Sequence, residues 1–225
     1  MATTAPTRVP ARDRRLQIMA AAKGLFARQG FEGTTTREIA QRARVNEAII
    51  FRHFPSKEEL YWAIIDHECE LGAWRQTLRR QLSSGGSDRK VFVAIAEDIL
   101  VRRVRDGGLS RLLLFSALEN QQRSQRFFQT HVAAYYELIA EYIGRRIEQG
   151  AFRPVNPLLA ARGFVGMVVY HSLIQEIYGG KRYQDFAVKE VSETLTDIWL
   201  AGMEVRSGQT PRREAKPNHS SGRTR

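Results

Sequence analysis

Apolar residues recur at helical spacing along most of the chain. The first series has the i, i+3, i+4, i+7 spacing of an amphipathic helix: Ile18, Ala21, Ala22 and Leu25. Gly30 follows, where a glycine commonly ends a helix. The period-two alternation of a strand is absent from the sequence, as is any internal repeat. The pattern predicts an all-α protein of about nine helices.

Polar residues mark the starts of several helices. Thr35 and Glu38 have the spacing of a capping box, in which each side chain accepts a hydrogen bond from the other residue's backbone N–H. Asn46 is a favourable N-cap for a short helix over about residues 47–53. A second capping box opens a long helix expected over residues 56–82.

The rest of the chain continues as helices divided by glycine-rich breaks. Asn156 followed by Pro157 is typical of a helix start, because proline suits the first helical position. The expected helices cover about residues 91–106, 112–118, 124–149, 157–178 and 185–203. Beyond Glu204 the chain is rich in Arg, Ser, Pro and Gly without apolar periodicity, which predicts a disordered tail.

The formal net charge of +11 is divided unevenly along the 225 residues. Residues 1–60 carry +5, residues 61–203 carry +2 and residues 204–225 carry +4. Because basic segments attract polyanions, this distribution predicts an N-terminal module that binds a polyanion, a nearly neutral body and a basic tail.

The composition excludes several classes of protein. The single cysteine excludes an intramolecular disulfide framework and a multi-thiolate zinc site, and it is consistent with a reducing compartment. No run approaches the roughly 18 consecutive apolar residues of a membrane span, and the N-terminus has no apolar segment of a secretory signal. We therefore expect a cytoplasmic protein with no membrane partner.

Catalytic chemistry has little support in the sequence. The consecutive polar residues 66–69, Asp-His-Glu-Cys, point to different faces of a helix. The zinc-protease pattern is missing, because Leu71 and not a second histidine stands four residues after His67. A G-x-S-x-G motif and a P-loop are missing as well. We expect no enzyme activity, no catalytic or metal-binding residues and no cofactor.

Residues 13–65 carry the strongest functional signal. Three short predicted helices, the last two joined by a three-residue turn, are typical of a helix-turn-helix, which places its second helix in the major groove of DNA. The sequence here resembles the DNA-binding domain of the TetR/AcrR family of bacterial transcriptional regulators. The matching runs are Ile18–Ala22, Leu25-Phe26, Gly30-Phe31, Thr35–Ala40, Ala43, Val45 and Phe51–Leu60.

The resemblance implies a domain order and a function. The expected parts are a flexible basic N-terminal arm (1–12), a helix-turn-helix DNA-binding domain (13–58), a helical effector-binding and dimerisation domain (59–203) and a disordered basic tail (204–225). The implied function is a ligand-responsive repressor that binds a near-palindromic operator in double-stranded DNA as a homodimer and is released by a small-molecule effector.

The resemblance also implies DNA contacts at matching positions. They lie in the second helix, the turn, the recognition helix and the start of the next helix: Thr36, Arg37, Arg44, Asn46, Glu47, Ala48, Phe51, His53 and Lys57. The first two would approach a phosphate and the groove edge, and the recognition helix begins with three residues that face base edges. The two rings would lie against the sugar–phosphate backbone, and the lysine would meet a phosphate at a helix N-terminus.

The sequence departs from the family at three of these positions. Arg44 stands where glycine is common, Asn46 where serine or threonine is common, and Phe51 where a tyrosine would offer a hydroxyl to a phosphate. Several positions also have a plainer interpretation. The arginines can form a solvated helix face, Lys57 can line an exposed first turn, and His53 can be buried.

The long C-terminal part is rich in aromatic side chains, and the resemblance implies a small-molecule cavity there. The candidate ligand-binding residues are Phe92, Phe115, Tyr135 and His171. Aromatic residues at helical spacing are also what a hydrophobic core provides, so both interpretations stay open.

Small residues lie beside large apolar ones in the helix expected over 157–178. Glycine within a helix costs about 1 kcal/mol relative to alanine, so a pair of them indicates close packing against another helix. Together with the last helix, this predicts a four-helix interface between two chains, formed by Gly163, Gly166, Val169, Tyr170, Leu195 and Trp199. A core within one chain is the alternative, and it accounts for one face of each helix.

The sequence therefore leaves two candidate functions. The first is the ligand-responsive dimeric repressor. The second is a constitutive or structural dimeric DNA-binding protein without an effector. An enclosed cavity with converging polar groups would favour the first.

Overall fold

The computed structural model describes residues 10–69, 71–105 and 107–205. Within these ranges the regular elements are helices, and β pairing is limited to an isolated bridge between Phe152 and Glu204. The elements are α1 (Ala11–Gln29), α2 (Thr36–Ala43), α3 (Glu47–His53), α4 (Lys57–Cys69), α5 (Leu71–Leu82), α6 (Asp88–Arg105), α7 (Gly107–Glu119), α8 (Gln121–Phe127), the π-helical turn η1 (Phe128–Val132), α9 (Ala133–Glu148), α10 (Pro157–Glu176), α11 (Gly180–Tyr183) and α12 (Val188–Met203). The all-α prediction is confirmed.

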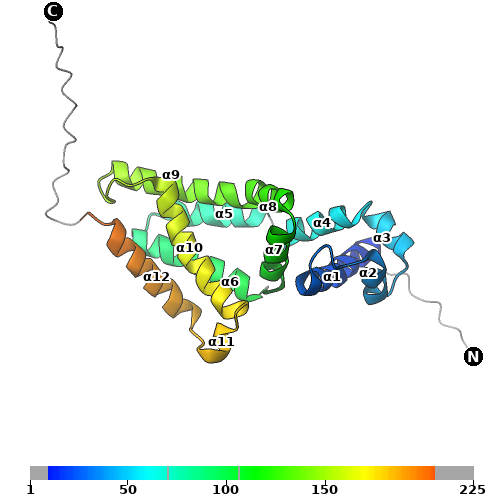
Figure 1. The fold of residues 1–225 in the computed structure, drawn as a ribbon. Helices are drawn as coiled ribbons and strands as arrows, with labels where there is room; N and C mark the ends of the chain where they lie inside the picture. The colour runs from blue at the N-terminus through cyan, green and yellow to red at the C-terminus, as the bar shows by residue number, and fades with distance from the viewer. Residues whose placement is uncertain (1–9, 70, 106, 206–225) are drawn as a thin grey trace, which may run out of the picture.

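The molecule is elongated, with α1–α4 at one end and the remaining helices at the other (Figure 1). The N-terminal end has its own hydrophobic core, in which Ile18, Phe26, Ile39, Ile50 and Tyr61 are almost fully buried. This core also takes in the rest of the apolar face of α4 and extends to Leu112 of α7. The N-terminal unit thus packs beyond the boundary expected at residue 58.

A second core holds the body together. It is built from α5, α6, α9, α10 and α12, and Phe92 is fully buried at its centre. The Phe92 ring centroid lies 4.4 Å from that of Trp199 and 4.9 Å from that of Phe164. In Figure 1, α10 crosses from the end of α9 toward α11, and α12 returns beside α6.

The caps predicted at Thr35 and Asn46 are present, and at the second predicted capping box the Glu59 N–H donates to Ser56 Oγ over 3.0 Å. The Glu38 backbone N–H donates to Thr35 Oγ1 over 3.2 Å, and the Thr35 N–H donates to the Glu38 carboxylate over 2.8 Å. Asn46 accepts the Ile49 N–H over 2.9 Å. Hydrogen bonding to Thr35 holds the pKa of Glu38 below its ordinary value. The first turn of α2, which begins the helix-turn-helix, is therefore closed by local chemistry.

The helix expected over 56–82 is described as α4 and α5, and residue 70 between them lies outside the description. Two helix predictions need correction. The helix expected over 124–149 is divided by η1, because a wider π-helical turn shifts the helical register without any proline or glycine to mark it. The short helix α11 follows Gly179, where only a break was expected.

The termini lie mostly outside the described residues. Of the arm predicted over 1–12, residues 11 and 12 belong to α1, and residues 1–9 lie outside the description. The tail predicted over 204–225 is described only to residue 205.

Candidate nucleic-acid interface

The two helices of the helix-turn-helix are joined by a turn that Arg44 makes possible. Arg44 has φ 53° and ψ 46°, in the left-handed region that favours glycine, and its N–H caps the end of α2. This conformation gives the physical reason why glycine is common at this position. The side chain of Arg44 is exposed.

Exposed side chains on α2 and α3 include Arg37, Ala48 and Phe51, the last with 46% of its surface accessible. Ile50 is buried on the opposite side of α3, and Ile49 is half-buried. The apolar residues of the short helix therefore anchor it, and its outward residues are free to meet a groove.

Several of the predicted contact residues already have partners within the chain. Thr36 Oγ1 donates to the Glu47 carboxylate over 3.0 Å, which ties the start of α2 to the start of α3. Asn46 uses its side-chain oxygen as the α3 cap, so only its amide N–H₂ remains to donate. These bonds position the recognition helix and narrow the groups left for base contact.

Lys57 was expected either to contact a phosphate or to line an exposed first turn, but in the structure its side chain is bonded to the backbone of a neighbouring turn. Its Nζ donates to the carbonyl oxygens of Phe31 and Thr34, both over 2.9 Å, and lies 4.3 Å from the Phe31 ring centroid. A lysine has three N–H donors, so one remains. Lys57 holds the start of α4 against the α1–α2 turn, and its phosphate contact stays a prediction.

His53 is half-buried at the end of α3. Arg15 of α1 donates to its backbone carbonyl over 3.2 Å, and the Arg15 guanidinium lies 4.4 Å from the Phe54 ring centroid. Gln17 donates to the carbonyl of Ala43 over 2.8 Å. Sequence analysis missed these two α1 residues, because their roles depend on backbone groups about 26 to 38 residues away.

None of the four candidate ligand-binding residues lines a described pocket, although Phe92 and Tyr135 belong to the same core. Phe92 belongs to the body core, and Phe115 is partly exposed on α7. Tyr135 packs against Trp74 with 5.2 Å between ring centroids. His171 packs against Phe186, and burial lowers its pKa. A ligand cavity at these residues therefore stays a prediction.

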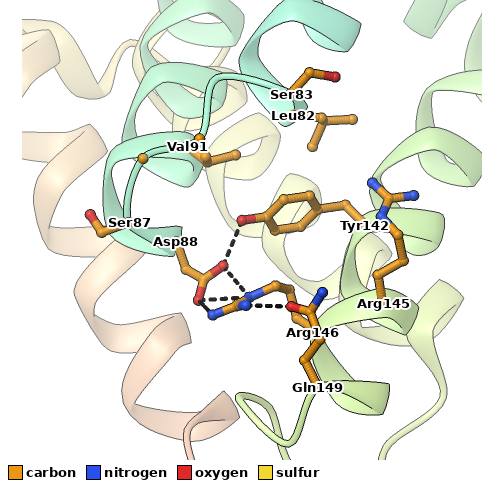
Figure 2. A pocket seen from close by; sticks show the side chains of 11 residues that line it. Leu82, Ser83, Ser87, Asp88, Val91, Tyr142, Arg145, Arg146 and Gln149 are labelled. Atoms are coloured by element: carbon orange, nitrogen blue, oxygen red, sulfur yellow. Dashed lines mark hydrogen bonds and ion pairs between the residues drawn. The ribbon is translucent and has the colours of Figure 1, made fainter.

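Two pockets are described, and neither is lined by those four residues. The larger, about 440 Å³, lies between the α5–α6 connection and the end of α9 (Figure 2). In it Asp88 accepts bonds from Tyr142 over 2.6 Å and from Arg146 over 2.8 Å. Burial and the bond to Asp88 raise the pKa of Tyr142. The polar groups satisfy one another, so this pocket has the character of a structural ion-pair network. The smaller pocket, about 280 Å³, lies beside α4 and α8.

The predicted dimer residues divide into two groups. Gly163 and Gly166 have open space where a Cβ would stand, and Tyr170 is 64% exposed on the same helix. Val169 and Leu195 are half-buried and pack against the body core. Trp199 is a correction: its ring is buried and its Nε1–H donates to the Ala160 carbonyl over 3.2 Å, so it faces its own core.

Large apolar side chains extend the exposed face of α10 and α12. Leu159 is 65% exposed and Ile198 is 60% exposed. We call Leu159, Gly163, Gly166, Tyr170 and Ile198 the α10–α12 face. By length and composition α10 is also a candidate membrane span among the described residues, with 28% of that stretch buried. A helix that packs one face in its own core and the other face against a second protein chain can be as apolar as a membrane span.

The exposed helix-turn-helix on a helical body defines a DNA-binding regulator. Residues 18–64 match the family described as bacterial regulatory proteins, tetR family, and residues 98–202 match the AefR-like transcriptional repressor, C-terminal domain. The chain belongs to the TetR family of transcriptional regulators, which are not enzymes.

Two relatives align over much of the chain. The uncharacterized HTH-type transcriptional regulator YfiR of Bacillus subtilis is 27% identical over 162 residues, which cover 68% of this chain and 76% of YfiR. The nucleoid occlusion factor SlmA of Vibrio atlanticus is 29% identical over 159 residues, which cover 69% of this chain and 80% of SlmA.

Solved structures share the fold. Thermus thermophilus FadR, a TetR family transcriptional repressor in complex with lauroyl-CoA, is 26% identical with a TM-score of 0.59, and the match covers 88% of this chain and 98% of FadR. AibR in complex with isovaleryl coenzyme A and operator DNA is 21% identical with a TM-score of 0.64, over 82% of this chain and 97% of AibR.

Proposed function

We propose that the protein is a repressor that binds a near-palindromic operator as a homodimer and leaves it when a small molecule binds the body. The observation that supports this most directly is the exposed surface of α2 and α3. Arg37 and Arg44 present guanidinium groups and Phe51 presents a ring, while Ile50 fixes α3 to the core.

DNA recognition divides between two kinds of residue. Arg37 and Arg44 are suited to phosphate or guanine contacts, and Ala48 is suited to a thymine methyl. Thr36, Glu47 and the cap formed by Asn46 set the position of the recognition helix through their hydrogen bonds. His53 and Lys57 remain proposed contacts to the sugar–phosphate backbone.

The dimer is proposed to form through the α10–α12 face. Glycines with open space above them allow two helices to approach closely, and the exposed Leu159, Tyr170 and Ile198 supply apolar area to bury. A twofold interface of this kind positions two recognition helices for two half-sites in inverted orientation.

Acyl-CoA thioesters are the first effector class to test. The support is the lauroyl-CoA in the FadR structure and the isovaleryl coenzyme A in the AibR structure. A ligand shifts the protein between DNA-binding and released states only when it binds the two states unequally.

The alternative is a DNA-binding protein without an effector. The observation that supports this alternative is the 29% identity to SlmA, which is named a nucleoid occlusion factor. A constitutive protein would hold its DNA with unchanged affinity whatever small molecule is added.

The deciding experiment begins with selection of bound duplexes from a random-sequence library by the full-length protein. We expect an inverted repeat of two half-sites. Binding to the selected duplex is then measured by fluorescence anisotropy during titration with short-, medium- and long-chain acyl-CoA, with free coenzyme A as the control. Loss of affinity with acyl-CoA alone supports the repressor. A non-symmetric selected sequence would contradict the dimer, and unchanged affinity with every acyl-CoA would contradict this effector class.

A further inference from the structure

A buried arginine joins the body to the DNA-binding end. Arg123 belongs to α8 and is only 7% exposed. Its backbone N–H donates to Asn120, the N-cap of α8, over 3.1 Å, so its place at the corner between α7 and α8 is fixed. The corner lies against the turn between α1 and α2, where Phe31 and Glu32 stand.

The guanidinium of Arg123 contacts three segments of the chain. Its Cζ lies 3.8 Å from the Phe31 ring centroid, a stacked cation–π arrangement. Its Nη2 lies 2.5 Å from Glu32 Oε1, its Nε lies 3.2 Å from Glu58 Oε2 and its Nη1 lies 3.8 Å from Glu119 Oε2. Glu32 belongs to the α1–α2 turn, Glu58 to α4 and Glu119 to α7. We call Arg123 and these four partners the corner clasp.

The α1–α2 turn is shaped to receive the clasp. The Phe31 N–H donates to Glu119 Oε2 over 3.0 Å. Gly30 has φ 76°, and a Cβ built there would collide with the Glu119 carboxylate. Lys57 binds the carbonyls of Phe31 and Thr34 in the same turn. The residue after Thr34 is the cap of α2, so the clasp connects directly to the first helix of the helix-turn-helix.

A buried guanidinium makes such a junction selective for one arrangement. The buried guanidinium is paired with carboxylates from separate segments, and moving either side away would take it from part of these partners, so the clasp resists displacement. Side chains from the α1–α2 turn, α4 and α7 together supply its carboxylate partners.

We propose that Arg123 is a positioning residue that fixes the orientation of the helix-turn-helix relative to the body, and so sets the spacing of the two recognition helices in the dimer. The inference rests on the proposed dimeric function. It adds the route by which a change at the α7–α8 corner reaches the operator.

The test compares two duplexes: the two-half-site sequence selected by the wild-type protein, and the same duplex with one half-site scrambled. Arg123→Met removes the charge but keeps an unbranched apolar stem. We expect affinity for the two-site duplex to fall about tenfold, within the range of coupling between distant sites. Affinity for the one-site duplex should change by less than about twofold, because the surface of α3 is intact.

A distance measurement tests orientation without DNA. Spin labels at Gln41→Cys of both protomers, in a Cys69→Ser background, should give a broader distance distribution when Arg123→Met is added. Arg126→Met is the matched control, since Arg126 is exposed on the same helix and stacks on Trp62. It should leave the ratio of two-site to one-site affinity unchanged.

Glu32→Gln is the milder variant and keeps Arg123 in place. It should lower the ratio of two-site to one-site affinity about threefold. If Arg123→Met fails to fold, the result for Glu32→Gln tests the proposal. Equal losses on both duplexes, or an unchanged ratio in both variants, would overturn the proposal. A wild-type protein that selects only a single half-site refutes the dimeric function instead, before any variant is measured.

Discussion

Arg44 shows how one backbone angle bears on both stability and recognition. Among the residues that the structure describes, Arg44 is the one non-glycine residue with a positive φ, and it stands in the turn between α2 and α3. The chain keeps an exposed guanidinium at a position where glycine would fit the backbone better, and we propose that this guanidinium contacts DNA. Strain of this kind often accompanies a functional role.

Arg44→Gly should therefore separate stability from binding. We expect the free energy of unfolding to rise by about 0.5–1 kcal/mol, because glycine adopts the left-handed region without Cβ strain. Operator affinity should fall, because a cation is lost. Urea denaturation and anisotropy measure the two effects. Gly150→Ala is the reverse control: Gly150 has φ 73° and open space above it, so alanine there should reduce stability. A less stable Arg44→Gly protein would contradict the argument.

Arg37→Ala tests the phosphate contact on α2. Arg37 is exposed, so its removal should leave the fold intact. We expect weaker binding and a decrease of about 1 in the slope of log affinity against log salt concentration. Binding isotherms from about 50 to 200 mM salt measure it. An unchanged slope would exclude the contact.

His131 is buried in η1, with its Nε2 lying 3.4 Å from Asp66 of α4. Burial lowers its pKa; Asp66 opposes this, while Arg75 of α5 and Arg126 of α8 add to it. Since the folded pKa is below the unfolded value near 6.5, the unfolded chain binds more protons and stability falls as pH drops below that value. His131→Gln should flatten the dependence of unfolding free energy on pH between about 7 and 5. His67→Gln, exposed on α4, is the control, and an equal pH dependence in all three proteins would refute the assignment.

At the scale of elements, capping chemistry predicted helix starts well and helix interiors less well. The caps at Thr35, Asn46 and Asn156 act over two or three residues, so their signals are local and complete in the sequence. The π-helical turn η1 has no such local signal in the sequence; within it His131 is buried and stacks on Phe127. The small-residue pattern of α10 predicted a face that the structure leaves exposed, whereas Trp199 of α12, predicted for the same interface, lies in the core of its own chain.

The α10–α12 face should respond to a charge placed on it. Leu159→Glu puts a carboxylate twice into the proposed symmetric interface, and the lost burial of one leucine alone is worth about 1.5–3 kcal/mol. We expect the dimer dissociation constant to rise at least about tenfold. Sedimentation velocity over a concentration series measures it. Leu118→Glu, on an exposed leucine of α7 outside this face, should leave association unchanged. A dimer of unaltered strength in Leu159→Glu would place the interface elsewhere.

At the scale of the whole molecule, the family and the DNA-binding end were predictable, and the connection between the ends was not. The helix-turn-helix is encoded within about fifty contiguous residues, so motif order reveals it. Arg123 acts on Glu32, which lies 91 residues away in the sequence. Of its carboxylate partners, Glu119 is only four residues away, but Glu32 and Glu58 lie in distant parts of the sequence. Such a set has no periodicity, and it becomes visible only when the fold brings its members together.

The two hydrophobic cores define what can be exchanged between proteins of this architecture. The DNA-binding end is nearly self-contained from Ile18 to Ile65, yet its core is completed by Leu112, and its turn is held by Glu119 and Arg123. A hybrid repressor assembled by joining a foreign N-terminal segment at residue 65 would carry over base recognition and lose the corner that orients it. The transplantable module is discontinuous: it is the first four helices together with the inner side of α7 and the start of α8.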